Sequence, residues 1–401
     1  MARVLKDRLQ IPLTGINLGG PITIRQGRKS WRMATYADTN KQQAAEPASP
    51  AYTGSGGKSD SASRGSRKKE LKAQQVRAIY RAARISGETA PYDTLTLKIY
   101  YPSQFSDSLE ERKSGVIPAA ASRAPFPVVI LMPDIDISHE SYSWLATELA
   151  QAGFAAVTYS WINEDAEGMV RSTPGVLLKR MTRKRFGKKP SCPALPSIFS
   201  ELKRVNRKGP LAGLINLSCC ILGGHATGGR MALLNANTDW FPSVCGVFSY
   251  AGHTLAEPGL GWDKRNVIPL PPDMPVLLMG GTEDGVIATA ERPRDNREDT
   301  GATGKIERTF RQGLKGKRGD RHLVLVEGAS HFTFVTPKDG STGLTFLDNR
   351  SQGGGKPLRR YLAKLIVTFC DKSCRGDPMS GADLTALADS SHSMVAHSEL
   401  K

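Results

Sequence analysis

A glycine-rich turn at residues 222–229 has the form of a hydrolytic nucleophile turn without its nucleophile. The apolar run 215–222 leads into this turn and the helix-forming run 230–234 leads out of it, which is the strand–turn–helix context of the G-x-S-x-G elbow. Gly224 and Gly228 suit a sharp turn, because strand and helix backbones approach closely there. The centre of the turn is Ala226, whose methyl group has no lone pair to attack a carbonyl carbon. Either the scaffold does not perform serine hydrolysis, or the chain carries a change that disabled it.

Three further apolar runs, at 127–132, 275–279 and 322–326, are each followed by polar residues. Fully apolar strands separated by helical stretches predict an α/β fold with a mostly parallel sheet covered on both faces. Ligands bind beyond the carboxyl ends of the strands in such sheets. Asp284 and His331 follow the second and third runs closely, as Ala226 follows the run at 215–222. We therefore expect these three positions to meet at one edge of the sheet.

Three motifs stand at the ends of these runs: LGGHxxGG at 222–229, LMGGTxDGV at 278–286 and EGASHF at 327–332. On these motifs, residues from about 92 to 372 resemble the dienelactone hydrolase-like branch of the α/β-hydrolase superfamily, in the neighbourhood of chlorophyllases, platelet-activating factor acetylhydrolases and cutinase-type polyester hydrolases. The resemblance implies the α/β-hydrolase fold and a Ser–Asp–His triad at positions 226, 284 and 331. Asp284 and His331 match this triad, whereas Ala226 does not.

In a working triad the histidine accepts the hydroxyl proton and the carboxylate orients the ring. The oxyanion hole would use the backbone N–H groups of Thr227 and, from the loop after the 127–132 strand, Ile135. Relatives tend to have glycine where Asp134 stands, and an ionised carboxylate beside a developing oxyanion would raise the barrier. We interpret Asp134 and Asp136 preferentially as turn and N-cap residues that face water.

Candidate substrate-binding residues near the strand ends are His139, Trp161 and His225. An aromatic pocket there would suit an ester or lactone with a hydrophobic acyl part. The basic segment 179–189 is either a cap that attracts an anionic substrate or a mobile surface loop. Thr227, Ser330 or a water molecule activated by His331 and Asp284 could replace the missing hydroxyl, and each is a weaker alternative.

Positive charge is concentrated in two segments. Residues 1–90 contain 17 Lys/Arg and 6 Asp/Glu, residues 171–208 contain 12 and 1, and the whole chain carries a formal charge of +17. We expect a basic extension over 1–90, with a linker at 43–65 and an amphipathic helix near 67–85. A hydrolase domain should follow over 91–374, with a basic insertion near 171–208. The remaining residues, 375–401, should form a polar, frayed tail. The basic segments could contact an anionic surface, but no aromatic platform indicates a specific nucleic-acid partner.

The six cysteines lack the spacing of a zinc site, so we expect reduced thiols, no metal and no cofactor. The absence of a signal-like apolar segment at the start favours a cytoplasmic protein, and the basic N-terminal region leaves organelle targeting as an alternative. Two functions stay open at this point. One is a carboxylic-ester or lactone hydrolase that is inactive or nearly so because of Ala226, and the other is a non-catalytic pseudoenzyme that binds a ligand or acts as a scaffold.

Overall fold

The computed structural model describes residues 75–401 except 106–107, 116, 166–167, 264–265, 271–273, 290–300, 339–344, 350 and 353, together with strands β1 (Thr23–Gln26) and β2 (Lys29–Arg32). The chain divides into two compact units, Met1–Lys69 and Glu70–Lys401. Within the first unit β1 pairs with β2 in antiparallel fashion. The expected linker at 43–65 lies outside the described residues.

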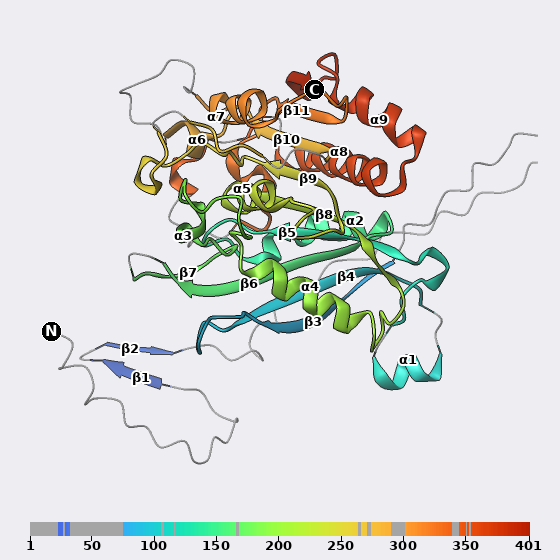
Figure 1. Cartoon of the computed structure of the whole chain (residues 1–401). Helices are drawn as coiled ribbons and strands as arrows, with labels where there is room; N and C mark the ends of the chain where they lie inside the picture. The colour runs from blue at the N-terminus through green and yellow to red at the C-terminus, as the bar shows by residue number, and fades with distance from the viewer. Residues whose placement is uncertain are drawn as a thin grey trace, which may run out of the picture. The chain divides into compact units, whose positions relative to one another are not determined.

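One large sheet forms the framework of the second unit (Figure 1). Its strand order is β12-β11-β10-β9-β8-β5-β6-β4-β3, and β7 pairs with β6 away from this path. The strands are β3 (Gln75–Arg84), β4 (Thr94–Ser103), β5 (Phe126–Met132), β6 (Ala155–Glu164), β7 (Val170–Ser172), β8 (Ile215–His225), β9 (Val244–Tyr250), β10 (Val276–Gly281), β11 (Arg321–Val326) and β12 (Val395–Leu400). The run from β6 through β5, β8, β9 and β10 to β11 is parallel, and β4 and β12 are antiparallel to their inner neighbours.

Helices cover both faces of this sheet. They are α1 (Leu109–Ser114), α2 (Ser143–Gln151), α3 (Leu178–Met181), α4 (Ala194–Val205), α5 (Ala226–Asn235), α6 (Gly285–Thr289), α7 (Gly304–Arg308), α8 (Gly355–Arg375) and α9 (Pro378–Ala388). Helices α2 and α8 contact each other on one face, and α4 and α5 lie on the opposite face (Figure 1). Among the described helices, none combines the length and the apolar character needed to cross a membrane.

Short tight helical turns complete the framework. The 3₁₀ turns are Ala121–Arg123, His139–Tyr142, Pro258–Leu260, His331–Phe334 and Thr345–Leu347, and a π turn spans Thr309–Gly313. The turn His139–Tyr142 follows the carboxyl end of β5, and the turn His331–Phe334 follows that of β11. Both turns therefore lie at the edge of the sheet where the sequence predicts the site.

The central strands are buried along their whole length. Every residue of β5, β10 and β11 is buried. Successive side chains of a strand point to opposite faces of the sheet, and helices cover both faces, so neither set of side chains contacts water. This explains why the runs at 127–132, 275–279 and 322–326 are continuous rather than alternating. The strand order and the two helical layers are those of the α/β-hydrolase fold, as the sequence predicts.

The prediction of an amphipathic helix near 67–85 is wrong for the residues that the structure describes. Residues 75–84 form strand β3, which pairs with β4 in antiparallel register from Gln75↔Ser103 to Arg84↔Thr94. Val76 and Ile79, which helical spacing would place on one face, are both half-buried in the strand. Ten residues of pairing, together with the Arg81–Glu201 ion pair at 2.7 Å, outweigh a local helical pattern that is short and only weakly periodic.

The prediction of a frayed tail beyond residue 375 is also wrong. Asp377 caps helix α9 by accepting a hydrogen bond from the Met379 N–H, and Leu384 and Leu387 are buried. Strand β12 then pairs with β11 and extends the sheet by one antiparallel strand. Polar residues are typical of an edge strand, because such a strand has a neighbouring strand on only one side and its other side is exposed.

Candidate functional site

The turn between β8 and α5 keeps the geometry of a nucleophile elbow. Ala226 has φ = 47°, a left-handed conformation that costs energy for a residue with a side chain. A Cβ at Gly228 would lie 2.2 Å from the Met132 carbonyl oxygen, and a Cβ at Gly224 would lie 2.5 Å from the Gly228 carbonyl carbon. Glycine is therefore required where the helix passes against strand β5. The chain holds a strained residue at the apex of this turn although that residue carries no reactive group.

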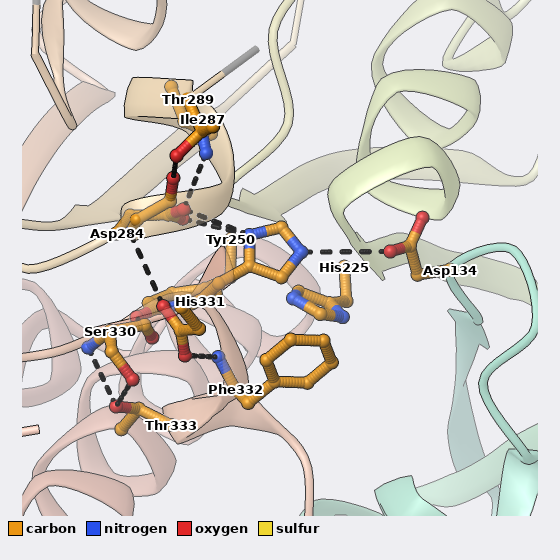
Figure 2. A network of polar contacts seen from close by, with 12 residues as sticks. Asp134, His225, Tyr250, Asp284, Ile287, Thr289, Ser330, His331, Phe332 and Thr333 are labelled. Atoms are coloured by element: carbon orange, nitrogen blue, oxygen red, sulfur yellow. Dashed lines mark hydrogen bonds and ion pairs between the residues drawn. The ribbon is translucent and has the colours of Figure 1, made fainter. Parts of the chain in front are cut away.

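Asp284 and His331 meet beside this turn. Asp284 follows β10, His331 follows β11, and the two side chains are buried. His331 Nδ1 lies 2.9 Å and 3.1 Å from the two Asp284 carboxylate oxygens (Figure 2). The Ile287 N–H also donates to Asp284 at 2.8 Å. The structure thus brings together the acid and the histidine that the sequence selects, with Nδ1 of the ring on the carboxylate, as in a triad.

Asp348 holds the histidine loop in place and was not identified from the sequence. Its carboxylate accepts hydrogen bonds from the N–H groups of His331 at 3.0 Å, Phe332 at 2.9 Å and Gly285 at 3.3 Å. These donors come from two segments, so one carboxylate fixes the loop after β11 to the start of α6. A single aspartate outside any motif gives no sequence signal for this role.

The interpretation of Asp134 as a water-facing turn residue is wrong. Its side chain is buried and points into the site, where its Oδ1 accepts a hydrogen bond from the Thr227 N–H at 3.0 Å. Its Oδ2 lies 3.6 Å from His331 Nε2 (Figure 2). Asp136, two residues later, is half-exposed and pairs with Arg171 at 2.8 Å, so the two aspartates of this loop have different environments. The partner of each carboxylate accounts for this difference: the elbow N–H of Thr227 for Asp134 and the Arg171 guanidinium for Asp136.

His225 is fully buried behind the elbow and faces His331, with the two ring centroids 4.6 Å apart. The Tyr142 hydroxyl lies 3.1 Å from His225 Nδ1 and accepts a hydrogen bond from the Asp134 N–H at 3.0 Å. Burial lowers the pKa of His225 to about 3, so this ring is neutral. His225 therefore belongs to the polar network and not to the lining of the adjacent cavity.

The two carboxylates flanking His331 control its charge. Burial would lower the pKa of His331, but the charge of Asp284, the close approach of Asp134 and the hydrogen bond to Asp284 outweigh burial and raise it. Burial would likewise raise the pKa of Asp134, but the adjacent His331 and the Thr227 N–H hold it below its usual range. The His331 ring therefore lies between two carboxylates, and all three side chains are buried.

A cavity of about 790 Å³ adjoins the elbow. Thr227 and Ile135, the two expected oxyanion-hole residues, line it together with Trp161. The Trp161 ring is almost fully buried and its Nε1–H donates to the Tyr92 carbonyl at 2.7 Å, so it forms a fixed wall. His139 is not among the lining residues of this cavity and lies 3.5 Å from Glu140.

The basic insertion reaches the mouth of this cavity. Leu178 and Lys179, in helix α3, are among its lining residues, as are Arg171 and Arg230. Both arginines form ion pairs, Arg171 with Asp136 and Asp165 and Arg230 with Glu257 at 2.6 Å. Of the segment 179–189, Lys179 and Met181 line the cavity, and the charges of the two arginines are balanced by acidic neighbours.

Ser330 is held away from any nucleophilic role. Its hydroxyl lies 3.0 Å from that of Ser351 and 3.4 Å from that of Thr333. This hydroxyl cluster caps the turn that carries His331.

Three thiols gather near the amino ends of strands β8 and β9. Cys219 Sγ lies 2.8 Å from Cys245 Sγ, which lies 3.7 Å from Cys374 Sγ in the last turn of α8. Hydrogen bonds from Cys219 and Cys374 lower the pKa of the Cys245 thiol. The sequence spacing did not reveal this thiol cluster (Cys219, Cys245 and Cys374), because its members come from three separate elements.

Comparisons with known proteins give a likeness among solved structures only. No family model matches the chain, and no curated protein matches it. Among solved structures, the chain is similar to a ferulic acid esterase from Streptomyces cinnamoneus, with 18% sequence identity over 77% of this chain and 92% of that chain and a TM-score of 0.49.

Proposed function

We propose that this chain carries the site of a carboxylic-ester or lactone hydrolase, with the substrate bound in the cavity beside the elbow, and that its acyl-transfer route is closed at two positions. Ala226 removes the nucleophile, and Asp134 takes the hydrogen-bond donor that a serine hydrolase would offer to its oxyanion. The observation that carries the proposal is the 3.0 Å hydrogen bond from the Thr227 N–H to the Asp134 carboxylate.

The position of Asp134 bears directly on transition-state stabilisation. Oxyanion-hole donors work when they lie about 2.7–3.1 Å from the oxygen that becomes charged. Asp134 Oδ1 already fills that position at Thr227. A substrate carbonyl would have to displace a carboxylate that is held by both Thr227 and His331, and the negative charge would remain nearby. Replacing Ala226 with serine alone should therefore not restore efficient acylation.

The cavity supports the binding part of the proposal. Its volume of about 790 Å³ falls within the range of roughly 300–1,000 Å³ that small-molecule sites occupy. Apolar side chains, Val176, Leu177 and Met231, line it beside polar groups. Since the two lining arginines are ion-paired, a neutral ester or lactone suits this lining better than a free acid.

The test compares three variants: A226S, D134G and D134G/A226S. Stopped-flow hydrolysis of a short-chain p-nitrophenyl ester should show a burst of acylation only in the double variant. Restoring one oxyanion-hole donor changes the rate by about 10²–10³-fold in serine hydrolases. We expect the double variant to exceed A226S by that factor.

The matched control is D136G/A226S, which removes the neighbouring, half-exposed aspartate of the same loop. It should behave like A226S alone. Equal burst rates in A226S and the double variant would show that Asp134 does not block the site. A folded double variant that is silent toward a broad panel of esters would remove the hydrolase assignment.

A non-catalytic ligand-binding protein is the second candidate, and the occupied Thr227 N–H favours it equally. It predicts saturable binding of an ester by calorimetry without turnover, unchanged in H331A and lost in V176W, which fills the cavity. Loss of binding in H331A would contradict this second candidate, because His331 would then contact the ligand.

A further inference from the structure

We propose that Asp134, His225 and His331 form a binding site for a divalent transition-metal ion of the zinc class. One nitrogen or oxygen atom from each of these residues lies within 4.8 Å of the other two. Figure 2 shows the three side chains close together at the carboxyl edge of the sheet, where His225 ends strand β8, Asp134 lies in the loop after β5 and His331 starts the 3₁₀ turn after β11. Two imidazoles and one carboxylate form a donor set that leaves further coordination positions for water.

The spacing of these groups fits a shared ion. His331 Nε2 and Asp134 Oδ2 are 3.6 Å apart, which is too long for a hydrogen bond. Ligands bonded to zinc at about 2.0–2.1 Å are separated from one another by roughly 3.3 Å in a tetrahedral site. Movements of the order of an ångström would bring all three atoms to bonding distance.

A second atom of each side chain is already held by a neighbour. His331 Nδ1 contacts the Asp284 carboxylate at 2.9 Å, and Asp134 Oδ1 accepts from the Thr227 N–H at 3.0 Å. His225 Nδ1 lies 3.1 Å from the Tyr142 hydroxyl. Metal-binding histidines are held in this way, with the outer ring nitrogen on a carboxylate or another polar group and the inner one on the ion.

The inner ring nitrogens are buried without hydrogen bonds. Within the described part of the chain, neither His225 Nε2 nor His331 Nε2 has a hydrogen-bond partner, and both rings are almost completely buried. His331 Nε2 faces the Asp134 carboxylate at 3.6 Å as an ion pair. A buried polar nitrogen without a hydrogen bond costs free energy. An ion between the two rings and Asp134 would replace the proton on His331 Nε2, coordinate both nitrogens and keep a positive charge beside the carboxylate.

The donor set selects the class of metal. Imidazole nitrogen suits zinc and neighbouring transition metals, whereas calcium and magnesium prefer oxygen ligands alone. The thiol cluster at the other end of the sheet would instead take a soft metal through sulfur. A useful probe must therefore distinguish nitrogen and oxygen ligands from sulfur ligands.

Cobalt(II) is such a probe, because its visible spectrum reports geometry and thiolate ligands add an intense near-ultraviolet charge-transfer band. The full chain, free of any polyhistidine tag and stripped with a chelator, is dialysed against Co²⁺ and the bound metal is counted. We expect one ion per chain, visible bands without a thiolate band, and displacement by Zn²⁺. The measurement needs no ester, so its failure would leave the proposed ester binding untouched.

Variants assign the ligands. H331A and D134N should each weaken Co²⁺ binding by at least about 100-fold, and D284N, which removes a supporting carboxylate, by about 10–100-fold. D134N keeps the size of the side chain, so it remains informative where H331A fails to fold. H322Q changes a buried histidine at the start of β11, outside the site, and should bind as the parent does.

Three outcomes would overturn the proposal. One is a folded chain that retains no ion after dialysis. Another is binding that is unchanged in both H331A and D134N. The third is a thiolate charge-transfer band that disappears when Cys245 is replaced by serine, which would place the ion in the thiol cluster.

Discussion

Strand β11 has a buried histidine at its start, His322, and another five residues beyond its end, His331, and the two rings have opposite environments. At His331 the charges of Asp284 and Asp134 outweigh burial and raise the pKa. At His322 burial, with Lys372 acting in the same direction, lowers the pKa to about 4, and Asp320 opposes this only weakly. The same residue type is held as a cation at one end of the sheet and as a neutral ring near the other.

The two ends of the sheet differ in the same way beyond these rings. At the carboxyl ends, loops from separate strands bring carboxylates, imidazoles and backbone N–H groups into one connected network. Near the amino ends of β8 and β9, the thiol cluster makes its closest contacts with itself. Loops after the carboxyl ends of parallel strands are the usual place for ligand sites. This position at the carboxyl ends is the reason for which we propose the polar network, and not the thiol cluster, as the site of ester chemistry.

The largest effect on stability should come from adding a methyl group at the elbow. In G228A the new Cβ would lie 2.2 Å from a backbone oxygen of β5, which cannot move without disturbing the sheet. We expect a loss of about 3 kcal/mol or more in the free energy of unfolding, or no folded protein. Urea unfolding measures this loss.

G246A near the amino end of β9 is the matched control. Its new Cβ would lie 2.8 Å from the Ile221 Cδ1 atom, the flexible end of a side chain. We expect it to cost about 1 kcal/mol or less. Similar unfolding midpoints for the two variants would mean that the elbow is not the more tightly constrained end.

A smaller effect should come from His322 as the pH falls. Its folded pKa of about 4 lies below the unfolded value of about 6.5, so its contribution to stability is complete above pH 6.5. Between pH 6.5 and 4 the unfolded chain takes up the proton first, and up to about 3 kcal/mol of stability is lost. H322Q should flatten this part of the stability profile in urea unfolding. An identical pH slope in parent and variant would show that His322 is not held neutral.

The smallest effect on the fold is expected from oxidation of the thiol cluster. The 2.8 Å separation of Cys219 and Cys245 predicts that hydrogen peroxide joins them, with loss of one hydrogen from each thiol and reduction of the peroxide to two water molecules. Peptide mapping should find this disulfide in the parent and in C374S but not in C245S. A disulfide between Cys245 and Cys374 would contradict the expected order of reactivity.

Much of the framework could be predicted from the sequence. Mainly apolar runs identified β5, β10 and β11, because strands covered on both faces leave few positions for polar side chains; Arg321 and His322 at the start of β11 are the buried exceptions. Strand β3 was missed, because ten residues with scattered apolar positions are compatible with either helix or strand until a partner strand is present. Helix α9 was not predicted although Asp377 and Pro378 are a usual helix start, because the polar composition of residues 375–401 is typical of a frayed tail.

The sequence by itself determined that the elbow has no nucleophile, since alanine lacks a lone pair in any fold. It also determined that Asp284 and His331 follow strand ends, because the apolar runs fix where the strands stop. Only the tertiary structure decided the direction of Asp134 and the role of His225. Their positions depend on Thr227, Tyr142 and His331, which come from distant parts of the chain and meet only when the sheet has assembled. Side-chain direction in a loop is set by such contacts and not by local sequence.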